Sequence, residues 1–380
     1  MRILTPEAQK DFLNRGFSRR DLGRLAALLT AGATLPFYNE AALAQLSSIG
    51  RLPPDAVKIN ANENPLGPCA EAMEAMYTVV RKGGLYQYEE SPAFANAMAE
   101  VEGLRPDYVM PFAGSSDPLH RTLLAFASPN RSLVIAETTY EAPERAASFI
   151  GAKIIRVPLT KSYAHDARAM AKADPNAGVI YVCNPNNPTG TLTPRADIEY
   201  LLANKPKDAI VLLDEAYIHF SSAPTCADLV AAGKDLILMR TFSKIYGMAG
   251  LRAGAAMARP DLLRKLEPLG VSIMPATGMV GATASLKAKN LVPERKTINK
   301  DIRDDVFSFL AKHNFSFIPS ESNKFMMDVK RHGMEVARAM AAEKVYIGRV
   351  WPSMPTHVRV TVGTRDEMEK FKAALLKVMG

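Results

Sequence analysis

Short apolar segments that alternate with helical stretches most constrain how this 380-residue chain can fold. Five of them occupy residues 133–136, 154–157, 179–183, 210–213 and 236–240. The stretches between them are rich in Ala, Arg and Glu and have helical periodicity. This alternation is typical of a parallel sheet whose two faces are both covered by helices. The sequence therefore predicts an α/β fold with a mostly parallel sheet.

The pattern changes after about residue 284. A Gly/Ala-rich segment at 249–257 predicts one more strand of the sheet. Beyond it we expect a long polar helix at 287–312, helices at 334–343 and from Asp366, and short strands at 315–319, 325–329, 345–350 and 358–362. Such a mixture is typical of a smaller α+β domain. We expect a large domain over residues 82–283 and a small domain formed by 45–81 together with 284–380.

The first 44 residues differ from the rest of the chain. Arg19 and Arg20 precede a modest apolar run at 25–37, and Ala42-Leu43-Ala44 is a small-x-small cleavage pattern. This order predicts a twin-arginine signal peptide over residues 1–44 and a periplasmic or otherwise exported protein. The apolar run is too short to span a bilayer, so we expect no stable membrane insertion after cleavage. The alternative is a cytoplasmic protein with an amphipathic N-terminal helix.

Composition argues against several classes of function. The formal net charge is +8, yet the chain has no run of five basic residues, so nucleic-acid binding is disfavoured and anionic small ligands fit better. The six histidines and three cysteines lack metal-ligand spacing, and we expect no metal site. We expect the three cysteines to be core thiols.

The segment around Lys244 predicts an amine that forms an imine. Thr241-Phe242-Ser243-Lys244 follows a predicted strand, and Arg252 comes eight residues after the lysine. Desolvation and a neighbouring cation lower the pKa of such an amine, and Arg252 with the two hydroxyls would suit a phosphate. The alternative is a surface lysine in a loop that enters a helix.

Two polar loops follow neighbouring strands. The loop Asn184-Pro185-Asn186-Asn187-Pro188-Thr189-Gly190 comes directly after strand 179–183 and predicts a rigid rim where ligands bind, or turn chemistry alone. Asp214 directly follows the strand expected at 210–213, and Tyr217 comes three residues after Asp214. The acid suits a protonated heterocyclic nitrogen, and the tyrosine could reach the same ring. The alternative is an Asp that caps the next helix.

A small-residue segment, Ala113-Gly114-Ser115-Ser116-Asp117-Pro118, leads into a helix that we expect from Leu119. Backbone N–H groups at such a helix start can cradle a phosphate. Ser and Asp are also common helix caps, so this motif alone is weak.

In order and spacing, these four motifs resemble the fold-type I aminotransferases of class I/II, and most of all the histidinol-phosphate aminotransferase family. Asn60-Ala61-Asn62-Glu63-Asn64-Pro65-Leu66-Gly67-Pro68 and Arg359-Val360-Thr361-Val362-Gly363-Thr364 extend the resemblance from about residue 58 to 370. The resemblance implies an aspartate-aminotransferase-like fold with a seven-stranded type of sheet. It also implies pyridoxal 5′-phosphate (PLP) as the cofactor.

The resemblance also implies roles for single residues. Lys244 holds PLP as a Schiff base and then serves as general base and acid. Asp214 pairs with the pyridinium nitrogen, Tyr217 and Asn187 bind the 3′-oxygen, and Tyr140 stacks on the ring. The phosphate site is implied to comprise Ser115, Ser116, Thr241, Ser243 and Arg252.

One tyrosine is implied to reach the cofactor of a partner subunit, so the resemblance predicts a homodimer with shared sites. Tyr88 matches that position. However, the family commonly has Tyr-Pro there and this chain has Tyr88-Glu89, so Tyr86 competes for the role.

On the substrate side, Arg359 resembles the arginine that grips an α-carboxylate, Arg349 matches an arginine that contacts a substrate phosphate, and Asn62 lies in the N-terminal loop. We expect transfer of an amino group from an L-amino acid, aromatic or otherwise bulky, to a 2-oxo acid. Phosphorylated donors stay open. Alternatives are a decarboxylase, racemase or lyase of the same fold, and an exported binding protein without turnover.

Overall fold

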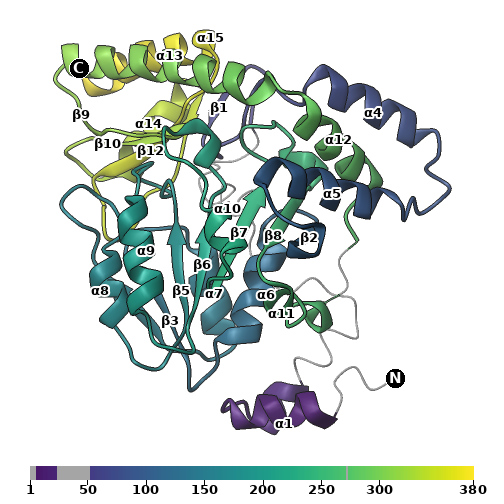
Figure 1. The fold of residues 1–380 in the computed structure, drawn as a ribbon. Coiled ribbons are helices and arrows are strands. Elements are labelled where there is room, and N and C mark those ends of the chain that lie inside the picture. The colour runs from purple at the N-terminus through teal and green to yellow at the C-terminus, as the bar shows by residue number, and fades with distance from the viewer. Residues whose placement is uncertain (1–5, 24–51, 271–272) are drawn as a thin grey trace.

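The computed structural model describes residues 6–23, 52–270 and 273–380. The apolar run at 25–37 and the expected cleavage site at Ala42–Ala44 lie outside these residues. Figure 1 shows a large sheet with helices around it, and a smaller layer of strands and helices above it. Among the described residues, no helix is long and apolar enough to cross a membrane.

The large sheet has seven strands in the order β2-β8-β7-β6-β5-β3-β4. They are β2 (Val109–Phe112), β3 (Ser132–Ala136), β4 (Ile154–Val157), β5 (Ala177–Cys183), β6 (Ile210–Asp214), β7 (Leu236–Thr241) and β8 (Gly254–Met257). β8 runs antiparallel to both of its neighbours, whereas the other pairings are parallel. Every residue of β3, β5, β6 and β7 is buried. The predicted mostly parallel sheet, covered on both faces, is confirmed.

The expected strand at 249–257 is wrong in its first half. Residues Ala249–Leu251 form the short helix η3, and Arg252 has left-handed backbone geometry with φ 55°. β8 begins only at Gly254. A Cβ at Gly254 would lie 2.8 Å from the carbonyl carbon of Gly114 and 2.8 Å from the carbonyl oxygen of Arg240. Gly254 therefore lets β8 pass close behind the loop that precedes α6.

Nine helices of the described chain belong to the layers around this sheet. They are α4 (Ala70–Val80), α5 (Glu90–Glu102), α6 (Ser116–Phe126), α7 (Ala142–Phe149), α8 (Ala167–Lys172), α9 (Arg195–Asn204), α10 (Ala227–Ala231), α11 (Pro260–Leu263) and α12 (Ala276–Lys287). α6 begins three residues before the expected Leu119. α4 packs against α12, and α5 packs against α12 and β2. Together the sheet and its helices enclose the larger hydrophobic core.

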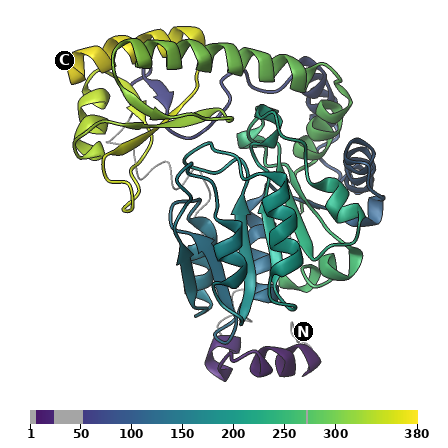
Figure 2. The same cartoon turned by 60° about the vertical axis from the view of Figure 1, so that its left-hand side comes forward.

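The smaller layer contains an antiparallel sheet in the order β12-β10-β9 and a parallel pair, β1 with β11. Its strands are β1 (Val57–Ile59), β9 (Ser316–Ile318), β10 (Lys324–Asp328), β11 (Val345–Ile347) and β12 (His357–Thr361). α13 (Leu291–Lys312), α14 (Gly333–Ala342) and α15 (Arg365–Met379) cover them and close a second core. Figure 2 shows α13 extending along the top of the molecule. The domain boundaries themselves stay a prediction.

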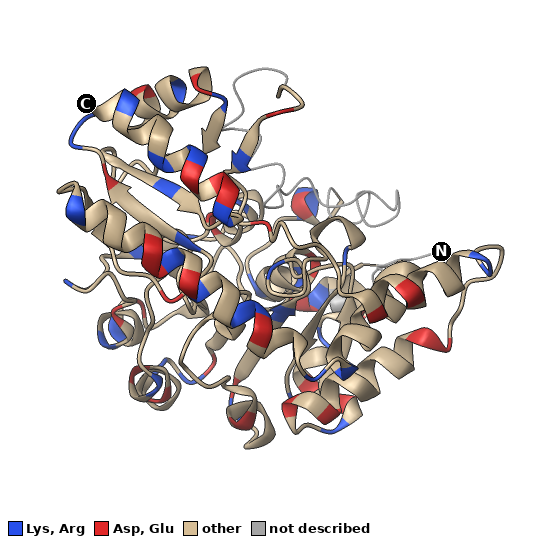
Figure 3. Cartoon of the chain, turned by 90° about the horizontal axis from the view of Figure 1, so that it is seen from above, with Lys and Arg blue, Asp and Glu red and all other residues tan. Residues whose placement is uncertain are grey.

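The long helix expected at 287–312 is α13, which begins four residues later than predicted and ends at Lys312 as predicted. α12 ends at Lys287 and α13 begins at Leu291, with Pro293 in its first turn, where a missing N–H costs nothing. Basic and acidic side chains alternate along α13, as Figure 3 shows, and Lys300 pairs with Asp304 one turn later at 2.7 Å. The outer face of α13 is therefore a mixed-charge solvent face.

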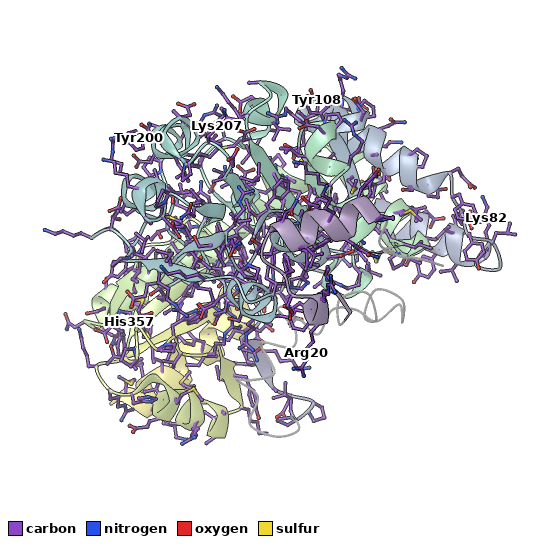
Figure 4. All side chains as sticks on the ribbon, turned by 90° about the horizontal axis from the view of Figure 1, so that it is seen from below. Arg20, Lys82, Tyr108, Tyr200, Lys207 and His357 are labelled. Carbon is purple, nitrogen blue, oxygen red and sulfur yellow. The ribbon has the colours of Figure 1, made fainter. Side chains whose placement is uncertain are left out.

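The N-terminal segment packs on the underside of the large layer, as Figure 4 shows for α1 (Pro6–Asn14). Phe12, Phe17 and Leu22 are buried against the larger core. Arg15 Nη2 donates hydrogen bonds of 2.6 and 2.7 Å to the carbonyl oxygens of Leu124 and Ala127, at the C-terminal end of α6. Arg19 and Arg20 are exposed.

Candidate active site

A cavity of about 220 Å³ opens at the carboxyl ends of β5, β6 and β7. Parallel strands place the residues that follow them at one edge of the sheet, which is where ligands bind in such folds. Most of the residues expected at the site line it. They are Ser115, Ser116, Tyr140, Asn187, Asp214, Tyr217, Thr241, Ser243, Lys244 and Arg252. Segments more than a hundred residues apart in sequence thus meet in one cavity.

Lys244 lies within this cavity and is only 6% exposed. Its Nζ donates a 3.4 Å hydrogen bond to the carbonyl oxygen of Ala61 and lies 5.6 Å from the centroid of the Tyr217 ring. The Tyr217 hydroxyl accepts a 3.0 Å hydrogen bond from Asn62 Nδ2. The 60–68 loop therefore contacts two of the three residues that the resemblance implies to be catalytic, Lys244 and Tyr217, whereas Asp214 is the third.

Asp214 occupies the closed end of the cavity. Its Oδ2 accepts a 2.8 Å hydrogen bond from the hydroxyl of Tyr181, and its Oδ1 accepts one of 3.1 Å from the N–H of Ala216. Burial raises the pKa of Asp214, while these hydrogen bonds and the charges of Lys244 and Lys324 oppose the rise. A buried carboxylate with this environment is suited to a cationic N–H partner.

Arg252 is a cation without a carboxylate partner among the described residues. Its side chain donates to the carbonyl oxygens of Ala249 and Ala113, at 3.0 and 3.3 Å, and burial lowers its pKa. A Cβ at Gly114 would lie 2.2 Å from Arg252 Nη2, so only glycine leaves room for the guanidinium there. A desolvated cation of this kind is complementary to an anion.

The same end of the cavity offers donors to that anion. Ser115 precedes the first residue of α6, Ser116, so N–H groups of a helix start face this end. Thr241 Oγ1 donates a 2.9 Å hydrogen bond to Ser243 Oγ. Two hydroxyls, a helix start and a desolvated arginine together fit the phosphate group of PLP.

Arg359 does not itself line the cavity, but it is fully buried next to Asn187, which does. Its Nη1 donates a 2.9 Å hydrogen bond to Asn187 Oδ1, and its Nη2 donates one of 2.7 Å to the carbonyl oxygen of Asn60. Asn62 Nδ2 lies 3.5 Å from the same Asn187 oxygen. The two asparagines thus link Arg359 to Tyr217.

Arg349, in contrast, faces a carboxylate. Its Nε and Nη2 donate to the two carboxylate oxygens of Glu141, at 3.2 and 2.6 Å, and its side chain is 7% exposed. Trp351 packs beneath it, with the Arg349 Cζ 4.8 Å from the indole ring centroid. Arg349 does not line the cavity of about 220 Å³, and its role towards substrate stays a prediction.

Tyr86 and Tyr88 lie away from this chain's own cavity. They follow α4 in the loop before α5 and are 72% and 71% exposed. Their rings stack on each other with centroids 5.4 Å apart. The single chain places both on the surface and does not distinguish between them.

Sequence reasoning missed two buried residues at the site. Tyr181 sits inside an apolar strand and reads as core, and Lys324 lies in a strand remote in sequence from the lysine motif. The parallel register of β5 and β6 pairs Cys183 with Asp214 and Tyr181 with Leu212. The available signal was the position of Tyr181, two residues before the end of the strand that lies beside Asp214.

Comparison with known proteins bears on these observations. The profile of the class I and II aminotransferases matches residues 54–375. The histidinol-phosphate aminotransferase of Moorella thermoacetica is 33% identical over 336 residues, 86% of this chain and 86% of that protein. The one from Bacillus subtilis is 30% identical over 330 residues, 85% of this chain and 91% of that protein.

Solved structures share the fold. Histidinol-phosphate aminotransferase from Sinorhizobium meliloti, in complex with pyridoxal-5′-phosphate, has a TM-score of 0.79 at 23% identity and covers 90% of this chain and 95% of that one. Aspartate aminotransferase from Thermus thermophilus with maleate has a TM-score of 0.75 at 16% identity, covering 95% and 99%. The chain belongs to the class I and II aminotransferase family, and it is a transaminase whose cofactor is pyridoxal 5′-phosphate.

Proposed function

We propose that the amino donor is an L-amino acid with a free α-carboxylate and a bulky uncharged side chain, and that a 2-oxo acid accepts the amino group. The position of Arg359 supports this most directly. Its guanidinium is fully buried and is oriented by Asn187, which lines the cavity, and by the carbonyl oxygen of Asn60. A planar arginine held in this way suits a carboxylate in bidentate geometry.

The pairing of Arg349 argues for an uncharged donor side chain. An arginine that is to bind a second anionic group needs N–H donors directed at the ligand. Here two donors of Arg349 go to Glu141, so the pair is close to neutral. The named relatives act on histidinol phosphate, which has a phosphate and no carboxylate. The pairing of Arg349 with Glu141 therefore disfavours a donor with a phosphate on its side chain.

The residues of the cavity divide the chemical work. When bound, PLP supplies a conjugated ring that takes up the electron pair left at the substrate α-carbon. Arg252, the start of α6 and the Thr241 and Ser243 hydroxyls bind its phosphate. Asp214 holds a proton on the ring nitrogen by its negative charge. Tyr217 and Asn187, which both line the cavity, would bind the 3′-oxygen of the ring.

Lys244 is the base in this proposal. Its Nζ accepts the proton that leaves the substrate α-carbon and returns it at a later stage, which requires the uncharged amine. Burial and the neighbouring cations favour that form. Tyr140 lines the cavity and would stack on the ring, and Asn62 fixes the Tyr217 hydroxyl through its 3.0 Å hydrogen bond.

A half-reaction screen tests the donor. The purified PLP enzyme is mixed with single amino acids and with histidinol phosphate, and the change in cofactor absorbance is followed. Aromatic and large aliphatic L-amino acids should react fastest and yield the 2-oxo acid. Histidinol phosphate as the fastest donor, or acidic amino acids as the fastest donors, would contradict the proposal.

The variant Glu141→Gln sharpens this screen, because it removes the charge that Arg349 now faces. Donors with an anionic side chain should gain relative to phenylalanine by about tenfold, the value of one charge-assisted hydrogen bond. Glu144→Gln is the matched control, since Glu144 lies in α7, three residues after Glu141, and pairs with Arg156 instead. An equal response to both variants would show that Arg349 has no bearing on the donor.

We also propose that the enzyme acts as a homodimer. Large apolar and aromatic side chains are exposed along α4, the loop that follows it and the segment before α12. They are Met73, Tyr77, Val80, Leu85, Tyr86, Tyr88 and Ile273. A patch of this kind on a single chain is typical of an interface. Light scattering of the PLP enzyme should give twice the monomer mass, and a monomer that remains active would contradict the proposal.

Comparison of Tyr86→Phe with Tyr88→Phe would identify the tyrosine that reaches the partner's cofactor. The variant that loses the phosphate contact should bind PLP more weakly by about tenfold. The other variant should bind it as the wild type does.

Finally, we propose that residues 1–44 are a twin-arginine signal and that the mature enzyme is periplasmic. The order of Arg19-Arg20, apolar run and small-residue cleavage pattern supports this. N-terminal sequencing of the periplasmic protein should begin at Gln45. The variant Arg19→Lys with Arg20→Lys should remain in the cytoplasm, and export of that variant at the wild-type level would contradict the proposal.

A further inference from the structure

A second lysine, Lys324, lies against the Tyr217 ring. It is the first residue of β10 and its side chain is fully buried. Its Nζ is 3.1 Å from the ring centroid and donates a 2.8 Å hydrogen bond to Ser322 Oγ. Lys244 Nζ faces the same ring at 5.6 Å. The two lysine nitrogens are therefore no farther apart than the sum of these two distances.

We propose that Lys324 is a positioning residue for the reaction: its buried ammonium group, held against Tyr217, favours the uncharged amine of Lys244 and the ionised phenol of Tyr217. The inference rests on the proposed role of Lys244 as the lysine that binds PLP. Lys324 does not line the cavity, so it acts through these two residues and not on the substrate.

Like charges in a buried site disfavour each other, so a cation near Lys244 makes loss of its proton easier. A cation over an aromatic face is attracted to the ring, and more strongly when the phenol carries negative charge. Both effects are strong here because neither lysine is in water. Lys244 needs the uncharged form to attack a carbonyl carbon and to accept a proton from the substrate.

The groups around Lys324 stabilise its charged form in this buried position. The ring face and the Ser322 hydroxyl are direct contacts, and Asp214 supplies the opposite charge nearby. Burial raises the pKa of Asp214, and the charges of Lys244 and Lys324 both act to lower it. Burial likewise raises the pKa of the Cys183 thiol, against the charge of Lys324. The positive charge of Lys324 therefore acts on Asp214 and Cys183, which both line the cavity.

Other ionisable groups face the same region from neighbouring elements. They are Tyr181 and Cys183 on β5, Asp214 on β6, Arg359 on β12, Arg252 before β8, Tyr140 and Glu63 at the cavity wall. A change at Lys324 leaves all of them in place. A difference in the titration of Lys244 between the wild type and a Lys324 variant therefore reports the loss of the Lys324 charge.

The test uses the protein freed of PLP. Lys244 is acetylated in short pulses over a range of pH, and the extent is read by mass spectrometry of its peptide. In Lys324→Met the midpoint of this titration should rise by about one pH unit, the effect of one unit charge at this separation in a protein interior. Below the midpoint, acetylation of Lys244 should slow by about tenfold.

Two control variants keep the charge at Lys324. Ser322→Ala removes its hydrogen-bond partner and should leave the midpoint near that of the wild type. Lys372→Met removes another buried lysine, one that pairs with Asp305 and Glu369 in the smaller layer, and should also leave it unchanged. An unchanged or lowered midpoint in Lys324→Met overturns the proposal.

A measurement on the wild type keeps the proposal testable if Lys324→Met does not fold. Exposed lysines are first methylated, and the buried Lys324 is then followed by NMR in protein with isotope-labelled lysine. Its ammonium should stay protonated at the pH where Lys244 titrates, and a neutral Lys324 there overturns the proposal. Borohydride reduction of the PLP enzyme separately tests Lys244: cofactor trapped on another lysine would refute that role alone.

Discussion

The hydroxyl of Tyr181 donates a 2.8 Å hydrogen bond to Asp214 Oδ2 from the adjacent strand of the large sheet. Burial raises the pKa of Asp214, and this hydrogen bond is the largest effect that opposes the rise. Tyr181 therefore helps to keep a carboxylate charged at the closed end of the cavity. Such a charge is what a protonated ring nitrogen requires.

Replacement of Tyr181 by Phe should weaken PLP binding. The ring remains, so no cavity forms, but the pKa of Asp214 rises further when the hydrogen bond is lost. At neutral pH the affinity for PLP should fall by about tenfold. The pH at which PLP affinity is half lost on the acid side should rise by about one pH unit. Equilibrium titration across pH measures both. Tyr346→Phe, a buried tyrosine on β11, should change neither quantity.

Arg252→Met should separate cofactor binding from stability. The arginine is desolvated and has no carboxylate partner among the described residues, so its loss costs the PLP-free protein little. PLP affinity should fall about a hundredfold, because a charge-assisted contact with the phosphate is lost. Calorimetry with and without PLP gives both quantities. Arg259→Met is the control, because Arg259 pairs with Asp235 and Asp261 and does not line the cavity. A large drop in the Tm of the PLP-free Arg252→Met protein, or a similar loss of affinity in Arg259→Met, would count against this role.

Gly247→Ala should destabilise the loop that follows Lys244. Gly247 has φ 67°, and a Cβ there would lie 2.1 Å from the carbonyl oxygen of Gly67. The backbone must move, so we expect a loss of about 2 kcal/mol or more in the free energy of unfolding. Gly250→Ala is the matched control because nothing lies within 4 Å of its Cβ position. Denaturant titration of both variants decides the matter.

His120→Leu should reduce the sensitivity of the fold to acid. Burial lowers the pKa of His120 to about 4, from 6.5. As the pH falls below 6.5, the unfolded chain takes up a proton that the folded chain does not, and stability is lost until the pH reaches about 4.

The variant should therefore lose about 2–3 kcal/mol less than the wild type between neutral pH and the acid end of this window. His165, with its pKa likewise lowered to about 4, retains part of the effect. Denaturant titrations at several pH values measure the difference. Parallel pH profiles for the two proteins would refute the assignment to His120.

The sequence predicts the large sheet well because its strands are buried on both faces and stand out as apolar runs. The same regularity places the loops after β5, β6 and β7 at one edge, so Asn187, Asp214 and Lys244 could be assigned to one site. The strand expected at 249–257 failed because a Gly/Ala-rich segment does not reveal the left-handed backbone at Arg252.

Side-chain pairings between remote segments escaped prediction for a different reason. Arg349 meets Glu141 across 208 positions, and Lys324 reaches Tyr217 from another sheet. Neither pairing leaves a local pattern, because each depends on how the two layers pack. The roles of the site residues and the domain boundaries remain predictions, as does the export signal.

The helix α6 has a cation at its last turn, and its first turn faces the cavity that we propose binds a phosphate. Ser116, its first residue, and Ser115, which precedes it, line the cavity, and Arg15 binds the carbonyl oxygens of Leu124 and Ala127 at the other end of the helix. An anion at the start of a helix and a cation at its end both complement the helix dipole. Removal of residues 1–44 would return those two carbonyl groups to water and leave the opposite end of the helix unchanged.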